Sequence, residues 1–314
     1  MRVRIPGLLA IVTVCALVGQ TVSAQRGPAA DPVVKEGTTV KIGDHTWAIP
    51  DGGVGGVPNV GIVVGTRATL VIDPGMGRRN GEAVLREVAR VSRTTEVYLA
   101  TTHFHPEHTT GYVAFPASAR YINSRAQEAE FAESGATMIQ NFAGRSPFQT
   151  ELLKDAQRRV ADIAFDKDYA LDLGGVRVRF LLVGPTHTKG DTGFFVEGDN
   201  VLFSGDVVMN QSFVAANANT SSVRAWLLAF DAFEAMKPRT IVPAHGPIGD
   251  GSLIPTLRTV MLDIQTRARA MKAQGRTADE VAMTLQAEVQ AKYPMWARLN
   301  GVGAAARVAF NEAP

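Results

Sequence analysis

Three histidines stand close together directly after a short apolar strand, and their spacing constrains the fold more than any other feature. They are His103, His105 and His108 in the segment Thr-Thr-His-Phe-His-Pro-Glu-His. In extended backbone His103 and His105 point to the same side, because alternate residues of a strand share a face. Pro106 then ends the extended run, so Glu107 and His108 are directed to a neighbouring point. This spacing predicts a turn at a strand end that suits two adjacent metal ions better than one.

Three further polar residues follow apolar segments in the same way. His187 lies in Gly-Pro-Thr-His-Thr-Lys-Gly-Asp, Asp206 ends Val-Leu-Phe-Ser-Gly-Asp, and His245 lies in Val-Pro-Ala-His-Gly. Neutral imidazole is the commonest protein ligand for zinc and similar metals, and a carboxylate has two oxygens that can bridge two cations. Metal binding explains this concentration better than chance placement on a surface. By contrast, His45 lies in a polar hairpin turn and is predicted to face solvent.

The first 24 residues have the features of a signal peptide. Arg2 and Arg4 precede an almost unbroken apolar run from Gly7 to Gly19, and Val22-Ser23-Ala24 supplies the small residues of a secretory cleavage site. We expect cleavage after Ala24 and a periplasmic or secreted protein. No retained membrane anchor is predicted, since the apolar run is too short to span a bilayer comfortably.

Removal of this segment changes the charge and the possible ligands. The chain has 32 basic and 30 acidic residues, and the segment takes away two Arg and no acid, which leaves 30 of each and a formal charge of zero. Neither nucleic acid nor an anionic membrane is therefore favoured as a partner, and a small-molecule substrate is expected. The single cysteine, Cys15, also goes, so any metal must be held by nitrogen and oxygen. Residues 25–37, rich in Pro, Ala and Gly, are predicted to be a disordered leader.

Residues 38–314 are predicted to form one domain of mixed strands and helices. Strands are expected at 38–49 (a hairpin), 59–64, 68–72, 96–100, 120–122, 176–183, 193–196, 200–203 and 240–242. Helices are expected at 81–91, in an insert at about 124–162 with a break near Gly144 and Pro147, at 223–236, and at the C-terminus over 256–272 and 278–292. This order predicts sheets covered by helices.

With these motifs in this order, the sequence resembles the metallo-β-lactamase superfamily, whose hallmark is H-x-H-x-D-H followed by separate His, Asp and His motifs. The resemblance runs from about Val40 to Gly249 and implies an α/β fold, a four-layer αββα sandwich with the metals at one edge. It also implies a ligand set: His103, His105 and His187 for one metal, His108 and His245 for the second, and Asp206 as the bridge. Asp73 matches an aspartate that supports the histidine loop from behind; a turn or helix cap is its alternative role.

Two residues bear on how far the resemblance extends. Glu107 stands where the family usually has Asp, and its extra methylene moves the carboxylate by about a bond length, whereas metal geometry tolerates a few tenths of an ångström. The second site is then weakened, shifted or repaired by a changed backbone, or Glu107 acts as a general base rather than a ligand. Asp206 resembles the glyoxalase and lactonase branches, because β-lactamases proper have Cys or Ser at this place.

We therefore predict a hydrolase with two zinc ions, in which a metal-bound hydroxide attacks an ester, lactone, β-lactam or thioester carbonyl. Asp206 and Glu107 are the predicted catalytic carboxylates. One metal in place of two, or iron in place of zinc, stays open. The alternatives are an iron-dependent redox enzyme on the same fold and a metal-binding module without activity.

Substrate contacts are harder to predict than metal ligands. Asn210 and Lys189 are candidates because they lie near Asp206 and His187 in the sequence, although either could be an ordinary surface residue. The glycine-rich stretch 52–56 is interpreted as a mobile flap or, more simply, as a hairpin connection. Apolar residues of the insert either line a pocket or pack a helix pair, and packing is preferred. They are Phe131, Met138, Phe142 and Phe148.

Overall fold

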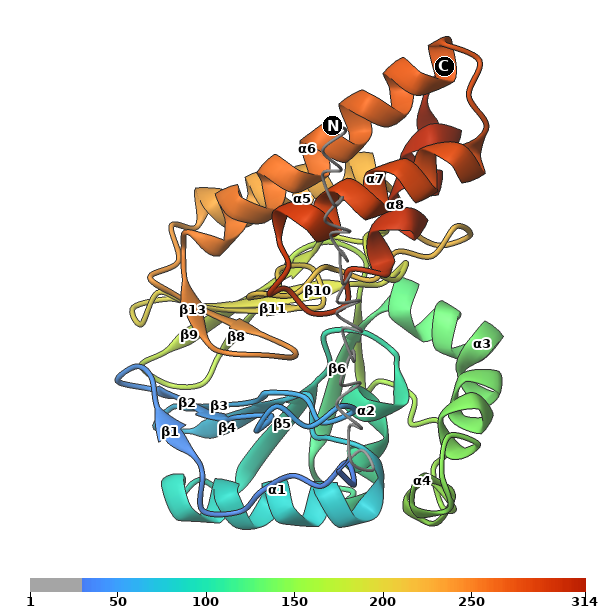
Figure 1. Cartoon of the computed structure of the whole chain (residues 1–314). Helices are drawn as coiled ribbons and strands as arrows, with labels where there is room; N and C mark the ends of the chain where they lie inside the picture. Colours follow the sequence, from blue (N-terminus) through green and yellow to red (C-terminus); the bar gives the residue numbers. More distant parts are fainter. Residues whose placement is uncertain (1–29) are drawn as a thin grey trace, which may run out of the picture.

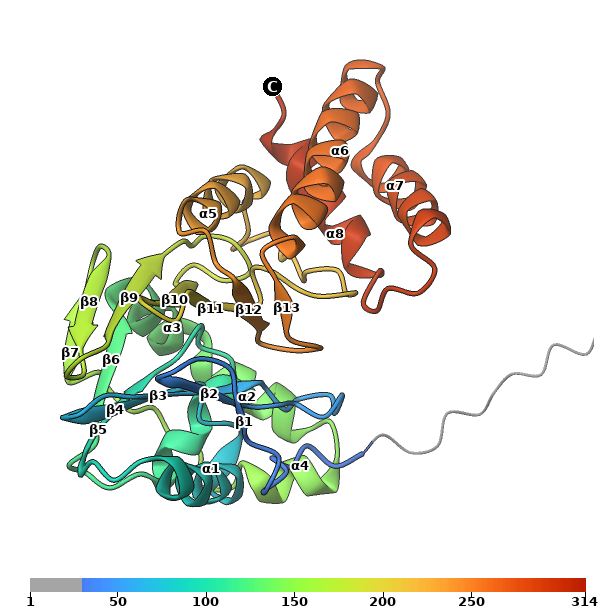
Figure 2. The same cartoon turned by 90° about the vertical axis from the view of Figure 1, so that its left-hand side faces the viewer.

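The computed structural model describes residues 30–314, in which two β-sheets pack face to face between helices (Figure 1). The predicted signal peptide and the start of the leader lie outside these residues. Helix α1 covers the outer side of the first sheet, and α5 to α8 cover the second (Figure 2). The chain therefore has the predicted four-layer αββα architecture.

The first sheet is antiparallel at its start and parallel at its end. Its strand order is β1-β2-β3-β4-β5-β6-β7, and β4 to β7 run parallel. Every residue of β4 is buried, as expected for a parallel strand covered on both faces. The strands are β1 Val40–Lys41, β2 Thr46–Ile49, β3 Val60–Val64, β4 Ala68–Ile72, β5 Glu96–Ala100, β6 Arg120–Ser124 and β7 Ile163–Phe165.

The second sheet has the order β13-β12-β11-β10-β9-β8. Its strands β11 and β12 are parallel and are joined through helix α5 (Val223–Ala235), while the other neighbours are antiparallel. The strands are β8 Tyr169–Asp172, β9 Arg177–Leu182, β10 Thr192–Val196, β11 Val201–Gly205, β12 Thr240–Pro243 and β13 Gly249–Asp250. The short strands β7, β8 and β13 were not among the predicted ones.

The space between the sheets is filled by aromatic and branched side chains. Phe180 and Phe194 of the second sheet meet edge to face at 4.7 Å between ring centroids. Phe203 reaches across to Gly61 of the first sheet, where an added Cβ would lie 2.6 Å from its ring. Glycine at this position is what lets the two sheets approach each other.

Two helices form the insert after β6. Helix α3 spans Arg125–Ala143 and α4 spans Pro147–Leu152, each with a serine at its N-cap. The predicted break near Gly144 is therefore present, but the helical part ends well before residue 162. Residues 153–162 instead run as an irregular segment, since the Tyr112 hydroxyl donates to the carbonyl of Gln157 and accepts from the amide of Arg159 at 2.9 Å.

Three helices close the chain: α6 Leu253–Ala273, α7 Ala278–Lys292 and α8 Gly301–Glu312. The first two were predicted and α8 was not. Its sequence, Gly-Val-Gly-Ala-Ala-Ala, begins with two glycines, which disfavour a helix. The fold overrides that preference, because the small side chains Ala305 and Ala309 are buried in the core shared with α6 and α7.

The prediction of a disordered leader is wrong for its described part. Val34 is buried, and its amide donates to the side-chain oxygen of Asn80 on α1 (Gly77–Val91) at 2.9 Å. Asn80 in turn donates to the carbonyl of Pro32, and the amide of Gly37 donates to Glu87. A polar composition does not reveal such docking, because the hydrogen-bond partners lie about fifty residues away in sequence. None of the helices in residues 30–314 combines the length and apolar character that a membrane crossing needs.

Candidate metal centre

The predicted ligands come together because several strand ends meet at one edge of the sandwich. Asp73 follows β4, and the histidine segment follows β5 and continues into helix α2 (Pro106–Thr109) and the 3-10 helix η1 (Thr110–Ala114). His187 lies between β9 and β10, Asp206 follows β11, and His245 follows β12. Carboxyl ends of parallel strands point to the same edge of a sheet, so residues far apart in sequence become neighbours here.

His103, His105 and His187 form a first group of three ligand atoms that all lie within 4.8 Å of one another. His105 Nδ1 lies 3.1 Å from His103 Nε2 and 3.3 Å from His187 Nε2. Three ring nitrogens at these separations face a common point. This is the donor set that a zinc ion or a similar cation takes from imidazoles.

Hydrogen bonds behind the rings set which nitrogen faces that point. His187 Nδ1 donates to the carbonyl of Ala215 at 2.7 Å, so its Nε2 carries the free lone pair. His103 Nδ1 lies 3.2 Å from the Thr102 hydroxyl, which itself donates to Asp73 at 2.8 Å. The hydroxyl therefore accepts from His103, and Nε2 of His103 is also free to bind a cation.

Glu107, His108 and His245 form the second group, also within 4.8 Å of one another. His108 Nδ1 lies 3.0 Å from Asp73 Oδ2, and His245 Nδ1 donates to the carbonyl of Val57 at 2.8 Å. Both rings therefore present Nε2 to the site. A Glu107 oxygen lies 3.9 Å from His108 Nε2, so the longer side chain does bring its carboxylate to this group.

Asp206 lies between the two groups. Its Oδ2 is 3.7 Å from His187 Nε2 of the first group, and its Oδ1 is 3.9 Å from His245 Nε2 of the second. The side chain is buried. One carboxylate oxygen therefore faces each group, which is the arrangement that a bridging ligand requires.

Three buried polar atoms at the second group have no hydrogen-bond partner: Glu107 Oε2, His108 Nε2 and Asp206 Oδ1. A buried carboxylate oxygen or imidazole nitrogen without a partner costs about 1–3 kcal/mol or more. Two acceptor oxygens and one nitrogen around one point suit a cation. The residues present at this site therefore fit a divalent metal.

Asp73 supports the histidine segment, as the resemblance implied. Its carboxylate accepts from the amide of Thr102 at 2.7 Å, from the Thr102 hydroxyl and from His108. Its φ of 57° turns the chain sharply after β4. An added Cβ on Gly111 would lie 2.2 Å from the carbonyl oxygen of Pro74, so the chain after the histidines packs tightly against this turn.

Burial sets the protonation of most of these histidines. Burial, followed by the neighbouring His108, lowers the pKa of His103 well below its usual value, and burial also lowers the pKa of His105 and of His245. They are neutral near pH 7, which is the form that binds metals. Burial lowers the pKa of His108 as well, but the Asp73 carboxylate outweighs burial and raises this pKa to about 9. A cation at His108 therefore has to displace a proton.

The loop that carries His187 is fixed by two acids that sequence analysis did not single out. Asp191 accepts from the Thr188 amide at 2.8 Å and the Thr188 hydroxyl at 2.7 Å, inside the loop. Glu130 of α3 accepts from the amides of Lys189 and Gly190. Burial raises the pKa of Glu130 above its usual value. These bonds tie the His187 loop to the insert helix.

Two cavities open beside the metal centre. One, of about 360 Å³, lies over His105 and Asp206, with Met138, Phe142 and Arg145 on one wall and Asn300 and Gly301 on the other. The second, of about 320 Å³, passes His245 and is lined by residues 53–55 and by residues 209–212. Arg298 lines both cavities. Its Nη1 lies 3.7 Å from Asp206 Oδ2.

The less certain site residues differ in where the structure places them. Asn210 lines the second cavity, and residues 53–55 form its rim. Lys189 turns away from the centre, because its ammonium pairs with Glu133 at 3.0 Å on the surface. Lys189 lines neither cavity, and its role as a substrate contact stays a prediction. His45 is half-buried and its Nδ1 hydrogen-bonds the carbonyl of Val64 at 3.1 Å, so its ring faces solvent only in part.

The apolar residues of the insert have mixed roles. Phe131 packs edge to face on Phe104, as predicted for a helix interior. Met138 and Phe142 pack in a small core, but they also line the cavity beside His105. The preference for packing over pocket lining is therefore only half right.

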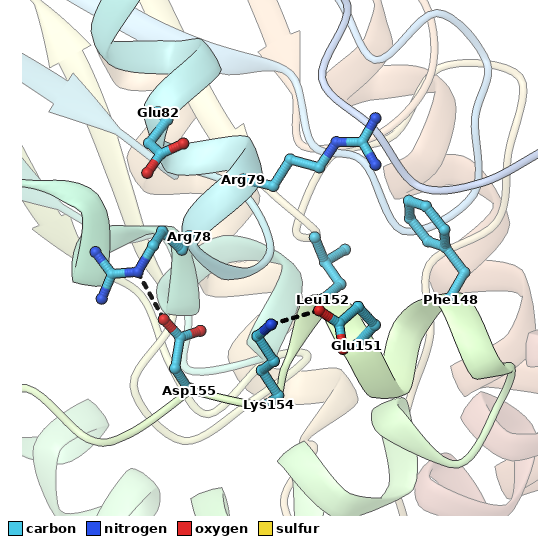
Figure 3. Close-up of a pocket in the computed structure, with 8 residues that line it drawn as sticks. All are labelled: Arg78, Arg79, Glu82, Phe148, Glu151, Leu152, Lys154 and Asp155. Carbon is cyan, nitrogen blue, oxygen red and sulfur yellow. Dashed lines mark hydrogen bonds and ion pairs between the residues drawn. The ribbon is translucent and has the colours of Figure 1, made fainter.

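A separate hollow of about 280 Å³ lies between α1 and α4 (Figure 3). Arg78 pairs there with Asp155 at 2.6 Å, and Lys154 pairs with Glu151. Arg79 extends towards the ring of Phe148, 5.4 Å from its centroid. The hollow contains none of the predicted site residues, and most of its charges are already paired. We assign it no part in the metal chemistry.

The comparison with protein families is decisive for the identity of the fold. A family model described as "Metallo-beta-lactamase superfamily" matches residues 53–245, which is more than half of the chain. The chain belongs to the metallo-β-lactamase superfamily. Membership and the two candidate metal groups together point to a metal-dependent hydrolase. No curated protein matches the chain significantly.

Solved structures share this superfamily fold. A metallo-β-lactamase from Pontibacter korlensis is 20% identical, with a TM-score of 0.58 over 72% of this chain and 98% of that one. A family protein from Thermus thermophilus is 18% identical, with a TM-score of 0.59 over 85% of this chain and 92% of that one. A stereoselective inverting sec-alkylsulfatase from a Pseudomonas species is 15% identical, with a TM-score of 0.66 over 87% of this chain and 49% of that one. At these identities the likeness shows the fold alone.

Sequence analysis missed Arg298 and Arg145, the two cations beside the metal centre. Arg298 stands in Trp-Ala-Arg-Leu-Asn, between two C-terminal helices, and Arg145 follows Gly144 at the end of α3. Neither is near a histidine in sequence or part of a motif. Only the packing of the C-terminal helices and of the insert against the strand ends brings them to the centre.

Proposed function

We propose that this chain is a hydrolase that depends on two divalent cations, zinc first, and cleaves an ester, lactone, β-lactam or thioester. One observation carries the proposal. Asp206 places one oxygen towards each of two three-ligand groups, and the buried atoms of the second group lack any other partner. A single ion would leave one of these groups and one oxygen of Asp206 without a cation.

Each metal would be held by one of the two ligand groups. His103, His105 and His187 would hold the first, Glu107, His108 and His245 the second, and Asp206 would contact both. Bound divalent cations lower the pKa of water and polarise a carbonyl oxygen, which is the chemistry that a hydrolase needs. Glu107 thus supplies the donor that its family position calls for, in spite of its longer side chain.

The chain's own groups handle the proton. Hydrolysis adds one water: a new bond forms from the water oxygen to the carbonyl carbon, the bond to the leaving oxygen, nitrogen or sulfur breaks, and the leaving atom takes a proton. One carboxylate oxygen of Glu107 would face the second metal, and its other oxygen would accept the water proton and return it to the leaving atom. Asn210 lines the second cavity, where its amide nitrogen donates to the carbonyl of Pro247, and its second N–H would donate to a substrate oxygen.

The first test combines metal content with activity. Protein purified without chelator should contain about two zinc ions per chain by elemental analysis and should hydrolyse members of an ester, lactone, thioester and β-lactam panel. Sulfate esters belong in the panel, because an alkylsulfatase is among the structures of similar fold. Iron with no hydrolysis would favour the redox alternative, and bound metal with no turnover of any kind would favour a metal-binding module.

Alanine variants assign the activity to the centre. His103→Ala and His187→Ala should lose metal and hydrolysis together. The control is His45→Ala, which removes a half-buried histidine that lies outside both ligand groups. Retention of metal and activity in both site variants would contradict the assignment.

We also propose that the protein works outside the cytoplasm, on a small molecule, after cleavage behind Ala24. The composition of residues 1–24 supports this proposal. N-terminal sequencing of the exported protein should begin at Gln25. An uncut chain retained in the cytoplasm would contradict it.

A further inference from the structure

Arg298 stands at the centre of the site without being a metal ligand. Its guanidinium lies 3.7 Å from Asp206 Oδ2, and its side chain is 40% exposed. Within residues 30–314, no carboxylate other than that of Asp206 lies within ion-pair distance of it. A partly exposed guanidinium beside a catalytic carboxylate keeps most of its five donors free for another anion.

The backbone around Arg298 is fixed. The amide of Ala297 donates to the carbonyl of Gln211 at 2.9 Å, and the amide of Phe213 donates to the carbonyl of Ala297 at 3.0 Å. Arg298 itself has a φ of 55°, in the left-handed region that non-glycine residues seldom adopt. The fold therefore maintains an unfavourable backbone conformation at the residue whose side chain lies over the metal centre.

A buried hydroxyl lies in the lining of the second cavity. Ser212 is 6% exposed and lines the second cavity, as Arg298 does, and its hydroxyl has no hydrogen-bond partner. Helix α8 begins at Gly301, in the lining of the first cavity, although the amides of Gly301 and Val302 already donate to the carbonyls of Arg298 and Leu299. Arg298 is the residue that lines both cavities, and its partly exposed guanidinium favours an oxyanion in either of them.

The opposite wall is apolar and also basic. Met138 and Phe142 line the first cavity, and the guanidinium carbon of Arg145 lies 3.4 Å from the centroid of the Phe142 ring. Within the described residues Arg145 has no acidic partner within ion-pair distance. A substrate chain lying against this wall is expected to be apolar, with Arg145 adding to the positive potential at the mouth.

We propose that the substrate carries an oxyanion, a carboxylate or a sulfate, which Arg298 binds beside the metal centre while an apolar part lies against Met138 and Phe142. The inference rests on the proposed hydrolase function and names its substrate class. Arg298 is a binding residue for the anion. Two divalent cations, if bound by the two ligand groups, would add positive charge beside Arg298 and so favour an anion there.

Three probes with one leaving group test the charge. They are 4-nitrophenyl butyrate, mono-4-nitrophenyl succinate and 4-nitrophenyl sulfate; in the succinate a carboxylate replaces the terminal methyl of the butyrate. The zinc-loaded enzyme should prefer an anionic probe, and the succinate or the sulfate will show which oxyanion fits. Arg298→Gln should raise KM for that probe about 10- to 100-fold more than KM for the butyrate, because a hydrogen bond to a charged group is lost only with the anionic probe.

Two further variants keep the result interpretable. Arg298→Lys should recover part of the affinity, since it restores the charge without the planar fork. Arg79→Gln removes a guanidinium from the hollow between α1 and α4 and should change nothing. Zinc content must equal that of the wild type in each. If Arg298→Gln contains less zinc than the wild type, KM for the anionic probe is compared between Arg298→Lys and the wild type instead.

A binding measurement separates this inference from the proposed function. Calorimetric titration with succinamate, a carboxylate that is not hydrolysed under these conditions, should show about 10- to 100-fold weaker binding to Arg298→Gln. Succinamate binding that the variant leaves unchanged would show that the metals hold the anion, and it would overturn the inference. Hydrolysis of all three probes without preference, unaffected in the variant, would do the same and leave the hydrolase standing. No hydrolysis of any panel member would contradict the proposed function, while the succinamate result would still decide on Arg298.

Discussion

Asp73→Asn tests whether the second metal depends on a residue that never touches it. The wild-type carboxylate accepts three hydrogen bonds, one of them from His108 Nδ1 at 3.0 Å. Asparagine has the same shape but offers one oxygen and one amide nitrogen. Thr102 already donates to both carboxylate oxygens, so the amide nitrogen has to replace an acceptor. If it faces His108, the ring reverses its tautomer, and the proton moves to the Nε2 that should bind the metal.

The expected magnitude follows from this geometry. Loss of an outer hydrogen bond to a metal-ligating histidine costs about 10- to 100-fold in metal affinity. That is about 1.4–2.7 kcal/mol at 25 °C. The affinity of the first group should fall less, because only His103 of its three histidines is linked to Asp73, and only through the Thr102 hydroxyl. Competition titrations of the apoprotein with a chromogenic zinc chelator resolve the two affinities.

Asp199→Asn is the matched control. Asp199 is also buried and accepts from the amides of Asp44 and His45 and from the Thr46 hydroxyl, at a turn outside the metal centre. Its variant should lose stability but keep both zinc affinities. An Asp73→Asn protein with a normal second affinity, or an Asp199→Asn protein with the same loss, would refute the reasoning.

Four further results are expected. Glu107→Gln should retain the first metal and lose much of the second, because a neutral amide is a poor metal ligand. Elemental analysis measures the metal content, and two tightly held metals in this variant would count against Glu107 as a donor. Removing zinc with EDTA should lower the melting temperature, since metal at a hundredfold excess over Kd stabilises the fold by about 2.7 kcal/mol. Binding of the second metal near pH 7 should release about one proton from His108, because a pKa of about 9 keeps this histidine protonated at pH 7. Above pH 9 the release should vanish. Calorimetry in buffers of different ionisation enthalpy measures the number of protons released, and Asp73→Asn should release fewer. Trp226→Ala should destabilise the fold by about 3–5 kcal/mol in urea unfolding, because Trp226 is fully buried and its indole donates to the carbonyl of Val207; a loss below about 1 kcal/mol would contradict the role of this ring.

The residues of the two candidate metal groups could be predicted because each lies next to a strand that the sequence pattern alone reveals. The strand 96–100 matches β5 to the residue, and Asp206 and His245 follow short apolar strands that need no tertiary information to recognise. Parallel strands place their carboxyl ends at one edge, so the positions of these residues in sequence already imply that they meet. The order of the motifs along the chain then indicated the superfamily.

Proximity in sequence does not determine where a long side chain points. Lys189 is two residues from His187, yet its ammonium reaches Glu133 on the surface. Its backbone amide, held by Glu130, contributes more to the site than its charge does. The sequence gives the place of a lysine in the chain, but the direction of its side chain, which has four rotatable bonds, depends on which partner the fold supplies.

The sequence by itself determined the superfamily, the four-layer architecture and the chemical nature of the centre, since these depend on local hydrophobic pattern and on residue type at strand ends. Only the tertiary structure decided what surrounds the centre. Arg298, Ser212 and the start of α8 reach it from segments with no local signal, through contacts between parts of the chain that are distant in sequence. A metal site is built from side chains on short, regular elements, whereas a substrate pocket is built from whatever packs against their ends.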